Sequence, residues 1–218
     1  MEGNQIFYSL KHPFRALFIS SSGCGKTTLA LQLLANRKNI IDTDIKKIYY
    51  VYVHDQPIFD VYRKSHPEIE FIKNIDDLET LITGQEDTLL VLDDLMIDFC
   101  TKKGSAYLAD WFTRRSRHFK CSVIVLLHSA FPENLRVCSL NTSYTVFFDT
   151  PRDRSTITYI QRQMYPGKQN QLVDAFYDAI SIKHGHLVLD HTPQTDEKLR
   201  VRNFILPRQK DMKYYVIK

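Results

Sequence analysis

Glycine is scarce in this sequence, with seven in 218 residues. Two of the seven, Gly23 and Gly25, stand close together in one short segment, which indicates a local need for unusual backbone angles. Low-complexity stretches and internal repeats are lacking, and this excludes a repeat array or a string of modules on flexible linkers. We therefore expect one domain that spans residues 1–218.

Disulfide and membrane signals are also lacking. The cysteines lie far apart, with no CxxC pair and no Cys/His spacing typical of a zinc site: Cys24, Cys100, Cys121 and Cys138. We interpret them as reduced thiols of an intracellular protein. No apolar run approaches the roughly 20 residues that cross a bilayer, and the first residues are polar, unlike a signal peptide. The sequence thus predicts a soluble protein that stays inside the cell, with no membrane partner.

Charge of one sign does not dominate. Lys and Arg number 29 against 25 Asp and Glu, for a net charge of +4. This mild basic bias is compatible with a nucleic-acid partner but does not require one. Hydrophobic residues make up 44% and charged residues 25%, which is ordinary for a globular protein with a full-sized core.

The pattern of apolar residues predicts the fold class. Short apolar runs alternate with longer amphipathic ones, which is typical of an α/β fold with a mainly parallel sheet. The expected strands are 14–19, 48–53, 70–72 at an edge, 89–92, 122–127 and 144–148, with 185–189 and 201–206 in a C-terminal tail. The expected helices are 27–35, 106–117, 155–165 and 169–180.

The strongest signal is the segment 20–27, SSSGCGKT. It matches the phosphate-binding loop G-x-x-x-x-G-K-[ST] at every fixed position except the first, where Ser20 replaces glycine, and it lies between an expected strand and an expected helix. Gly23 and Gly25 allow successive N–H groups to point at phosphate oxygens, and the helix adds its positive N-terminal end. Lys26 should contact the β- and γ-phosphates, and the Thr27 hydroxyl should ligate Mg²⁺. We expect ATP and Mg²⁺ as cofactors, with the nucleotide bound by Ser22, Gly23, Cys24, Gly25, Lys26, Thr27 and Thr28.

A second acidic signal follows the buried-strand pattern Leu89-Leu90-Val91-Leu92. The carboxyl end of such a strand is where α/β proteins bind ligands. We expect Asp93 to hold Mg²⁺ and Asp94 to act on the water that attacks the γ-phosphate.

A third polar residue ends the next apolar strand, 122–127, at His128. That order suits the additional-strand ATPases, in which a strand inserted between the two motif strands presents a polar sensor to the γ-phosphate. His128 is either this sensor or a structural histidine that caps the strand end.

Together these residues resemble a family. The segments 22–28 (SGCGKTT) and 91–96 (VLDDLM) are similar to those of FtsK/HerA-type DNA-packaging ATPases, especially the group of Maverick/Polinton elements and related eukaryotic DNA viruses. The similarity runs from about residue 12 to about residue 204. It includes 112–118 (FTRRSRH), 122–124 (SVI), 139–141 (SLN), 144–148 (YTVFF), 151–153 (PRD), 163–167 (QMYPG), 178–179 (DA), 185–187 (GHL), Asp190 and 200–202 (RVR).

The resemblance implies a fold and a function. The fold is a RecA-like, additional-strand P-loop NTPase, a three-layer sandwich with a mainly parallel central sheet and a short C-terminal β extension. The function is that of an ATP-hydrolysing translocase, a pentameric or hexameric ring that drives a double-stranded DNA genome into a capsid. The implied partners are DNA without sequence preference and a capsid or portal-type protein, in the virion or in the cytoplasm or nucleus of the host cell.

The resemblance also implies the catalytic set Asp94, Lys26, Arg117 and His128. In FtsK and HerA proteins an arginine eleven residues before the sensor reaches into the neighbouring subunit's site, and Arg117 stands eleven before His128. Otherwise Arg117 is one more solvated or DNA-facing charge. The other candidates for this role are Arg136, Arg152 and Arg154.

Three residues depart from the family pattern. Ser20 replaces the first loop glycine, Asp94 stands where FtsK and HerA usually have Glu, and His128 stands where a glutamine is expected. A neutral imidazole both donates and accepts hydrogen bonds, as the glutamine amide does, so His128 can take its place.

Two further questions stay open at the level of sequence. Arg114, Arg115, Arg117 and Lys120 alternate with Trp111, Phe112 and Phe119, which indicates either a DNA-tracking surface or a helix with aromatics inward and charges outward. The alternatives to a translocase are a small-molecule or nucleoside kinase, which shares the phosphate loop, and a catalytically weak scaffold that binds nucleotide structurally.

Overall fold

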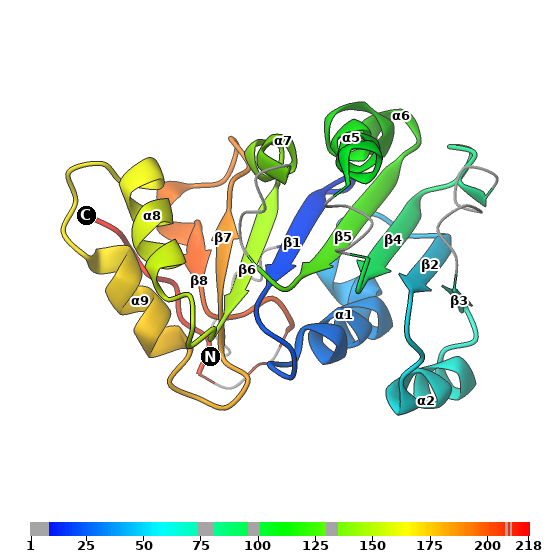
Figure 1. The fold of residues 1–218 in the computed structure, drawn as a ribbon, viewed down its shortest axis with the longest axis horizontal. Helices are drawn as coiled ribbons and strands as arrows, with labels where there is room; N and C mark the ends of the chain where they lie inside the picture. Colours follow the sequence, from blue (N-terminus) through cyan, green and yellow to red (C-terminus); the bar gives the residue numbers. More distant parts are fainter. Residues whose placement is uncertain (1–8, 74–80, 96–100, 130–134, 208, 210) are drawn as a thin grey trace, which may run out of the picture.

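A sheet of eight strands runs through the part of the chain that the computed structural model describes: residues 9–73, 81–95, 101–129, 135–207, 209 and 211–218. The strand order across the sheet is β3-β2-β4-β5-β1-β6-β7-β8 (Figure 1). In chain order the strands are β1 (Arg15–Ile19), β2 (Lys47–Tyr52), β3 (Ile69–Ile72), β4 (Thr88–Asp93), β5 (Cys121–Leu127), β6 (Tyr144–Phe148), β7 (His186–Asp190) and β8 (Val201–Arg202).

In sheet order, β3, β2, β4, β5, β1 and β6 pair in parallel. Strand β7 is antiparallel to β6, and β8 is antiparallel to β7. This confirms the expected mainly parallel sheet with a C-terminal β extension. The middle strands β4 and β5 are buried along their whole length. Continuous apolar runs such as TLLVL and SVIVLL are what a parallel strand covered on both faces requires.

Helices cover both faces of the sheet (Figure 1). On one face α1 and α2 pack through Leu31, Leu34 and Phe59, and on the other α5, α8 and α9 pack through residues such as Leu108 and Phe176. Two apolar clusters on opposite sides of one sheet make the predicted three-layer sandwich. With the labels of Figure 1, the helices are α1 (Lys26–Ile40), α2 (Pro57–Ser65), α5 (Lys102–Asp110), α6 (Ser116–His118), α7 (Arg136–Leu140), α8 (Ser155–Met164) and α9 (Gln171–Ala179).

The position of β5 decides the class of the fold. It pairs with β1 on one side, where Ile19 lies opposite Leu127, and with β4 on the other, where Leu92 lies opposite Val125. The strand that leads into the phosphate loop and the strand that ends in the two aspartates are therefore separated by one inserted strand. This is the additional-strand arrangement expected from the sequence.

Several boundaries differ from the sequence prediction. The expected helix 106–117 begins earlier, at Lys102, and is interrupted by a π-helical turn, Trp111–Arg115, before α6. The expected strand 201–206 pairs only over Val201–Arg202, although Phe204 and Ile205 are buried. Helices α2 and α7 were not predicted.

The structure gives the state of three thiols and the lengths of the described helices. Cys24, Cys121 and Cys138 are free thiols, and Cys100 lies outside the described residues. Burial raises the pKa of the Cys138 thiol to about 12. No helix in the described ranges combines the length and the apolarity that a membrane span needs.

Candidate nucleotide-binding site

The loop between β1 and α1 has the backbone that its sequence predicts. Gly23 and Gly25 have φ angles of 81° and 104°, in the left-handed region that disfavours any side chain. Gly25 caps α1, and its carbonyl accepts the first helical hydrogen bond, from the Leu29 N–H at 2.9 Å. Because α1 has no acidic residue in its first turn, the positive end of the helix is left to face the loop.

Ser20 fits where the motif has glycine. Its φ is not positive, so a side chain causes no backbone strain there. The residue is fully buried, and its hydroxyl donates to the Ser21 carbonyl at 2.9 Å. Its N–H donates to the Leu127 carbonyl at 3.1 Å, which fixes the start of the loop to the end of β5.

Lys26 lies folded over the loop that it follows. Its ammonium donates to the Ser20 carbonyl at 2.6 Å and to the Ser21 carbonyl at 3.0 Å. Burial lowers the pKa of Lys26, and the nearby carboxyl groups of Asp93 and Asp94 act in the opposite direction. A buried ammonium at this place is suited to bind phosphate oxygens.

The phosphate loop and the acidic strand end meet directly. The Thr27 hydroxyl donates to Asp93 Oδ2 at 3.0 Å, across 66 residues of sequence. The same oxygen accepts a hydrogen bond from the Tyr50 hydroxyl on β2 at 2.6 Å. A hydroxyl and a carboxylate in contact are the hard oxygen donors that Mg²⁺ prefers, so these residues fit the ion.

Burial raises the pKa of Asp93, and the hydrogen bonds from Tyr50 and Thr27 counteract this effect. The two hydroxyls therefore help to keep a buried carboxyl ionised. Burial and the charge of Asp93 in turn raise the pKa of Tyr50 well above its ordinary value, so the phenol stays a donor.

Asp94 and His128 form a second pair beside the first. Asp94 follows β4 with a φ of 63°, a left-handed conformation that aspartate tolerates better than most residues. This turn directs its carboxylate toward β5, where His128 Nε2 lies 2.5 Å from Asp94 Oδ1. The two residues named separately from sequence, as a base and as a sensor or strand cap, are thus in contact.

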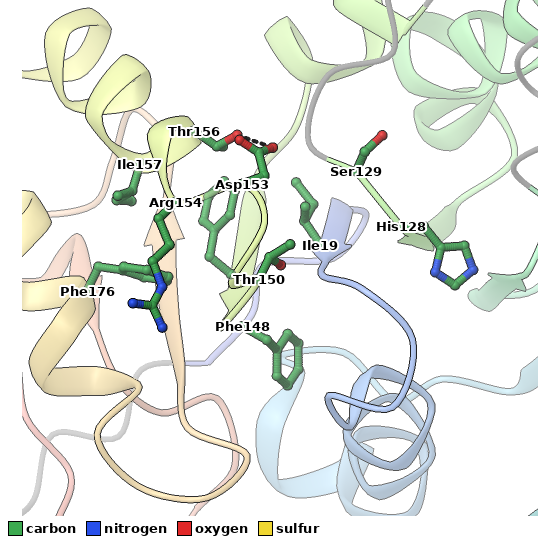
Figure 2. A pocket seen from close by; sticks show the side chains of 11 residues that line it. Ile19, His128, Ser129, Phe148, Thr150, Asp153, Arg154, Thr156, Ile157 and Phe176 are labelled. Carbon is green, nitrogen blue, oxygen red and sulfur yellow. Dashed lines mark hydrogen bonds between the residues drawn. The ribbon is translucent and has the colours of Figure 1, made fainter.

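Figure 2 shows side chains that lie at the ends of β1, β5 and β6. His128, after β5, and Arg154, after β6, lie on opposite sides of Ile19 at the end of β1. A small hollow lies at these strand ends and includes Asp153 and Thr156 among its lining residues. The acidic residues and His128 are therefore on the β4–β5 side of the loop, and the β6–α8 loop is on the other.

Arg117 lies at the far end of the sheet from this site. Burial lowers the pKa of Arg15, at the start of β1, and the positive charge of Arg117 is the second cause. The phosphate loop follows the other end of the same strand. Arg117 is exposed and lies at the end of the sheet opposite the phosphate loop of its own chain.

In the segment around Arg117, the aromatic side chains point into the core and the charged side chains point outward. Trp111 and Phe112 are buried in the core, and Phe119 packs against it. Arg114 is 80% exposed and pairs with Asp110 at 2.6 Å. The aromatic rings are therefore core residues and are not available to stack on bases, while the arginines remain on the surface.

Two contacts of the site were not predicted from sequence. Tyr52 lies opposite Asp93 in the sheet, and Tyr50 shares a face with Tyr52 because alternate residues of a strand point the same way. This period of two along β2 was the one feature of the sequence that could have predicted the contact of Tyr50 with Asp93. His184 lies 160 residues from Cys24, and its Nδ1 is 3.3 Å from the Cys24 carbonyl oxygen. No local pattern in the sequence marks that long-range contact.

Comparison with known proteins identifies the family. The family model described as Poxvirus A32 protein matches residues 7–185, most of the chain. The chain belongs to the poxvirus A32 protein family. No curated protein sequence matches it.

Solved structures share the fold of this A32-family chain. The DNA-packaging ATPase B204 from Sulfolobus turreted icosahedral virus is 12% identical, with a TM-score of 0.53 over 83% of this chain and 94% of B204. The genome packaging NTPase B204 from Sulfolobus turreted icosahedral virus 2, in complex with AMPPCP, is 13% identical, with a TM-score of 0.52 over 84% and 95%. At these identities the likeness establishes the P-loop NTPase fold.

Proposed function

We propose that this chain is an ATP-hydrolysing motor that drives a double-stranded viral DNA genome into a capsid. It acts as a ring of identical copies, in the host cell or in the virion. The observation that carries the proposal is the 3.0 Å contact between Thr27 and Asp93, which joins the phosphate loop and the acidic strand end in one site. Membership in the A32 family and the fold shared with B204, a DNA-packaging ATPase, support packaging as the use of that site. The resemblance to the Maverick/Polinton group in particular stays a prediction.

The residues of the site have separate tasks in this mechanism. Backbone N–H groups of the loop and the Lys26 ammonium bind the β- and γ-phosphates. Thr27 and Asp93 hold Mg²⁺, which supplies positive charge to the phosphate oxygens when bound. Asp94 accepts the proton of the attacking water as the bond to the γ-phosphorus forms, and ADP leaves. His128 holds the Asp94 carboxylate in place.

The remaining catalytic charge comes from a neighbour. Arg117 lies at the end of the sheet opposite its own phosphate loop, as its effect on Arg15 indicates. In a ring of copies that repeat head to tail, such a residue can face the next copy's site and stabilise the charge on the transferred phosphate. Hydrolysis is then tied to the contact between subunits, which is the coupling that a motor needs.

The sheet order disfavours a small-molecule kinase. Such enzymes usually place the two motif strands next to each other, whereas β5 separates β1 from β4 here. The polar end of β5 also contacts Asp94, which supports a role for the inserted strand at the reacting phosphate.

The proposal is tested by phosphate release from ATP, with and without random-sequence duplex DNA, over a range of protein concentrations. We expect DNA to increase turnover, and the rate per subunit to rise with concentration because each site needs a neighbour. Lys26→Ala should abolish turnover, and Asp94→Asn should slow it by roughly 10²–10⁴-fold while nucleotide still binds.

Two outcomes would contradict the proposal. Transfer of phosphate to a small acceptor in place of water would make the protein a kinase. Tight nucleotide binding with turnover no higher than that of Lys26→Ala would make it a scaffold.

A further inference from the structure

Arg15 is the first residue of β1, at the end of the sheet opposite the phosphate loop. Because alternate residues of a strand point the same way, Arg15 shares a face of the sheet with Leu17. Leu17 belongs to the same apolar cluster as Trp111 and Phe112 of the π-helical turn. Figure 1 shows α6, which follows that turn, beside the end at which β5 begins. Arg15 and Arg117 of α6 are therefore on the same face and at the same end of the sheet.

Main-chain groups hold Arg15 in place. Its Nε donates to the Asn141 carbonyl at 2.9 Å, just after α7, and its N–H donates to Ser143 Oγ at 3.3 Å. The Ser143 N–H in turn donates to the Arg15 carbonyl at 2.7 Å. Helix α7 packs against α5 and the π-helical turn. The Arg15 side chain therefore has a fixed position beside the element that carries Arg117.

No acidic group balances these two charges among the described residues. Arg114 and Arg115, on the same element as Arg117, both pair with Asp110. Arg15 and Arg117 form no ion pair in the described part of the chain, although Arg15 is half-buried. Burial lowers the pKa of Arg15 and the charge of Arg117 lowers it further, so the two guanidiniums are close enough to interact. Two such cations are a costly arrangement that a bound anion relieves.

A phosphate group is the anion that this pair fits. A guanidinium is a planar fork whose N–H groups match the oxygens of a phosphate. The Nη groups of Arg15 have no hydrogen bond to a described residue, because the Asn141 carbonyl takes only Nε. They and the exposed Arg117 guanidinium offer donors from two elements, β1 and α6. We propose, on the basis of the proposed function, that Arg15 and Arg117 together bind the γ-phosphate of a neighbouring copy's nucleotide.

The fixed position of Arg15 favours a reacting phosphate over a phosphate of DNA. Tracking DNA without sequence preference needs only surface charges, whereas stabilising a transition state needs donors that are already in place. Arg15 adds positive charge to the γ-phosphate oxygens while the oxygen of water bonds to phosphorus and the bond to ADP breaks; the arginine itself forms no covalent bond. Strand β1 also runs from Arg15 directly to Ser20 of the phosphate loop. It thus joins the charge that a copy donates to the site in which that copy holds its own nucleotide.

The test measures phosphate release from ATP without DNA, on the full chain at a concentration where copies associate. Arg15→Gln removes the charge and keeps an amide that can donate to the Asn141 carbonyl. We expect kcat to fall by roughly 10²-fold and the dissociation constant of ADP, which has no γ-phosphate, to stay unchanged. Arg15→Lys, which keeps the charge, should recover part of the lost kcat. Arg63→Gln is the matched control, since Arg63 is also half-buried but is paired with Asp55 and Asp60, and its kcat should be unchanged.

Mixtures of variants show on which side of the subunit contact Arg15 acts. Lys26→Ala lacks its own site but keeps the arginines that it donates, so mixing it with Arg15→Gln should restore a measurable fraction of turnover. Mixing Arg15→Gln with Arg117→Ala should restore nothing, because both lack a member of the same donated pair. The double variant of Arg15→Gln and Arg117→Ala should be slower than Arg117→Ala by no more than about threefold, since the two residues act as a unit.

Three results would overturn the inference. In the first, Arg15→Gln turns over ATP at the unmodified rate; if the slope of its log DNA affinity against log salt also falls by about one, the phosphate is that of DNA. In the second, Arg15→Gln recovers with Arg117→Ala and not with Lys26→Ala, which would make Arg15 a support of its own phosphate loop. In the third, Arg15→Gln and Arg15→Lys both lose ADP binding, which would make the residue structural. Failure of the proposed function is distinct from these, since the unmodified chain would then release no more phosphate than Lys26→Ala.

Discussion

At the scale of single residues, Asp93 illustrates how hydrogen bonds help to keep a buried carboxylate ionised. A carboxylate removed from water is unstable unless hydrogen bonds replace its hydration. Tyr50 and Thr27 provide two such bonds to one oxygen, from β2 and from α1. If Thr27 is drawn toward a bound metal ion, Tyr50 remains as the fixed partner that holds the carboxylate in position.

Tyr50→Phe tests this role. Removing the hydroxyl takes away a hydrogen bond to a charged group, typically about 1.5–3 kcal/mol, and lets the Asp93 carboxylate turn. We expect the Mg²⁺ concentration for half-maximal ATP turnover to rise by roughly tenfold, because the ion loses a fixed ligand. Tyr49→Phe is the control, since Tyr49 is buried in the opposite cluster on the same strand. An unchanged Mg²⁺ requirement in Tyr50→Phe would remove the residue from the site.

His186 gives the stability of the fold a pH dependence. Burial lowers its pKa to about 4, against an ordinary value of 6.5. As pH falls below 6.5 the unfolded chain takes up this proton and the folded chain does not, so stability is full above pH 6.5 and is lost as pH falls toward 4. This histidine should cost about 2 kcal/mol of unfolding free energy between pH 7 and pH 5.

Denaturant unfolding at the two pH values checks the expectation. His186→Leu should lose about 2 kcal/mol less stability on acidification than the unmodified chain does. His118→Leu, at an exposed position, should behave as the unmodified chain. Equal pH sensitivity in all three proteins would mean that His186 is protonated in the fold.

At the scale of elements, prediction from sequence succeeded where burial was uniform. β4, β5 and β6 are continuous apolar runs and were placed to within a residue or two. Helix α2 was missed because it has only nine residues, too few for a helical period to be told from other patterns, and it buries Phe59 alone. The end of the chain was overestimated as strand because Phe204 and Ile205 are buried by packing without pairing.

The residues of the candidate site also separate into those that the sequence predicted and those that it did not. The phosphate loop and Asp93 were predicted because their chemistry fixes residue types at fixed spacing within a few residues. Tyr50 and His184 were not, since each reaches the site through contacts across 43 and 160 residues that no local pattern encodes. The contact between Asp94 and His128 depends on the left-handed turn after β4. An aspartate can adopt this conformation, but its presence in the sequence does not predict it.

The element formed by α5, the π-helical turn and α6 presents Arg117, and subunit mixing tests its role. Arg117→Ala lacks the charge donated to a neighbour but keeps its own site, whereas Lys26→Ala has the reverse defect. We expect each variant alone to lose turnover by roughly 10³-fold or more, and a mixture of the two to recover a measurable fraction. Phosphate release in the absence of DNA is the measurement.

Arg114→Ala is the matched control for that experiment, because Arg114 is on the same element and pairs with Asp110. It should be active alone and should gain nothing from mixing. A mixture of Arg117→Ala and Lys26→Ala that is as inactive as its components would show that the arginine does not act across a subunit boundary.

At the scale of the whole molecule, the net charge is only +4, which limits how the proposed motor could hold DNA. Without a strong overall field, binding depends on local groups of arginine and lysine that contact phosphates and are indifferent to sequence. For the proposed motor, the exposed charges around Arg114 are the candidate for such a group.

Duplex binding measured by anisotropy against salt concentration tests this. Affinity should fall steeply with salt and should vary little between scrambled sequences of equal length. Arg114→Ala should reduce the slope of log affinity against log salt by about one, whereas Lys64→Ala on α2 should leave it unchanged. Strong preference for one duplex sequence would contradict a translocase that tracks the backbone.

The two margins of the sheet constrain any assembly of copies. β3, at one margin, has four residues, and β8, at the other, has two and is covered by an isolated bridge between Arg202 and Tyr214. Within the described residues neither margin offers a long free backbone ladder, which disfavours pairing of a neighbouring copy with the sheet. In the proposed ring, copies would then associate mainly through side chains, and such a contact can loosen and re-form with each turnover while every subunit keeps its own main-chain hydrogen bonds intact.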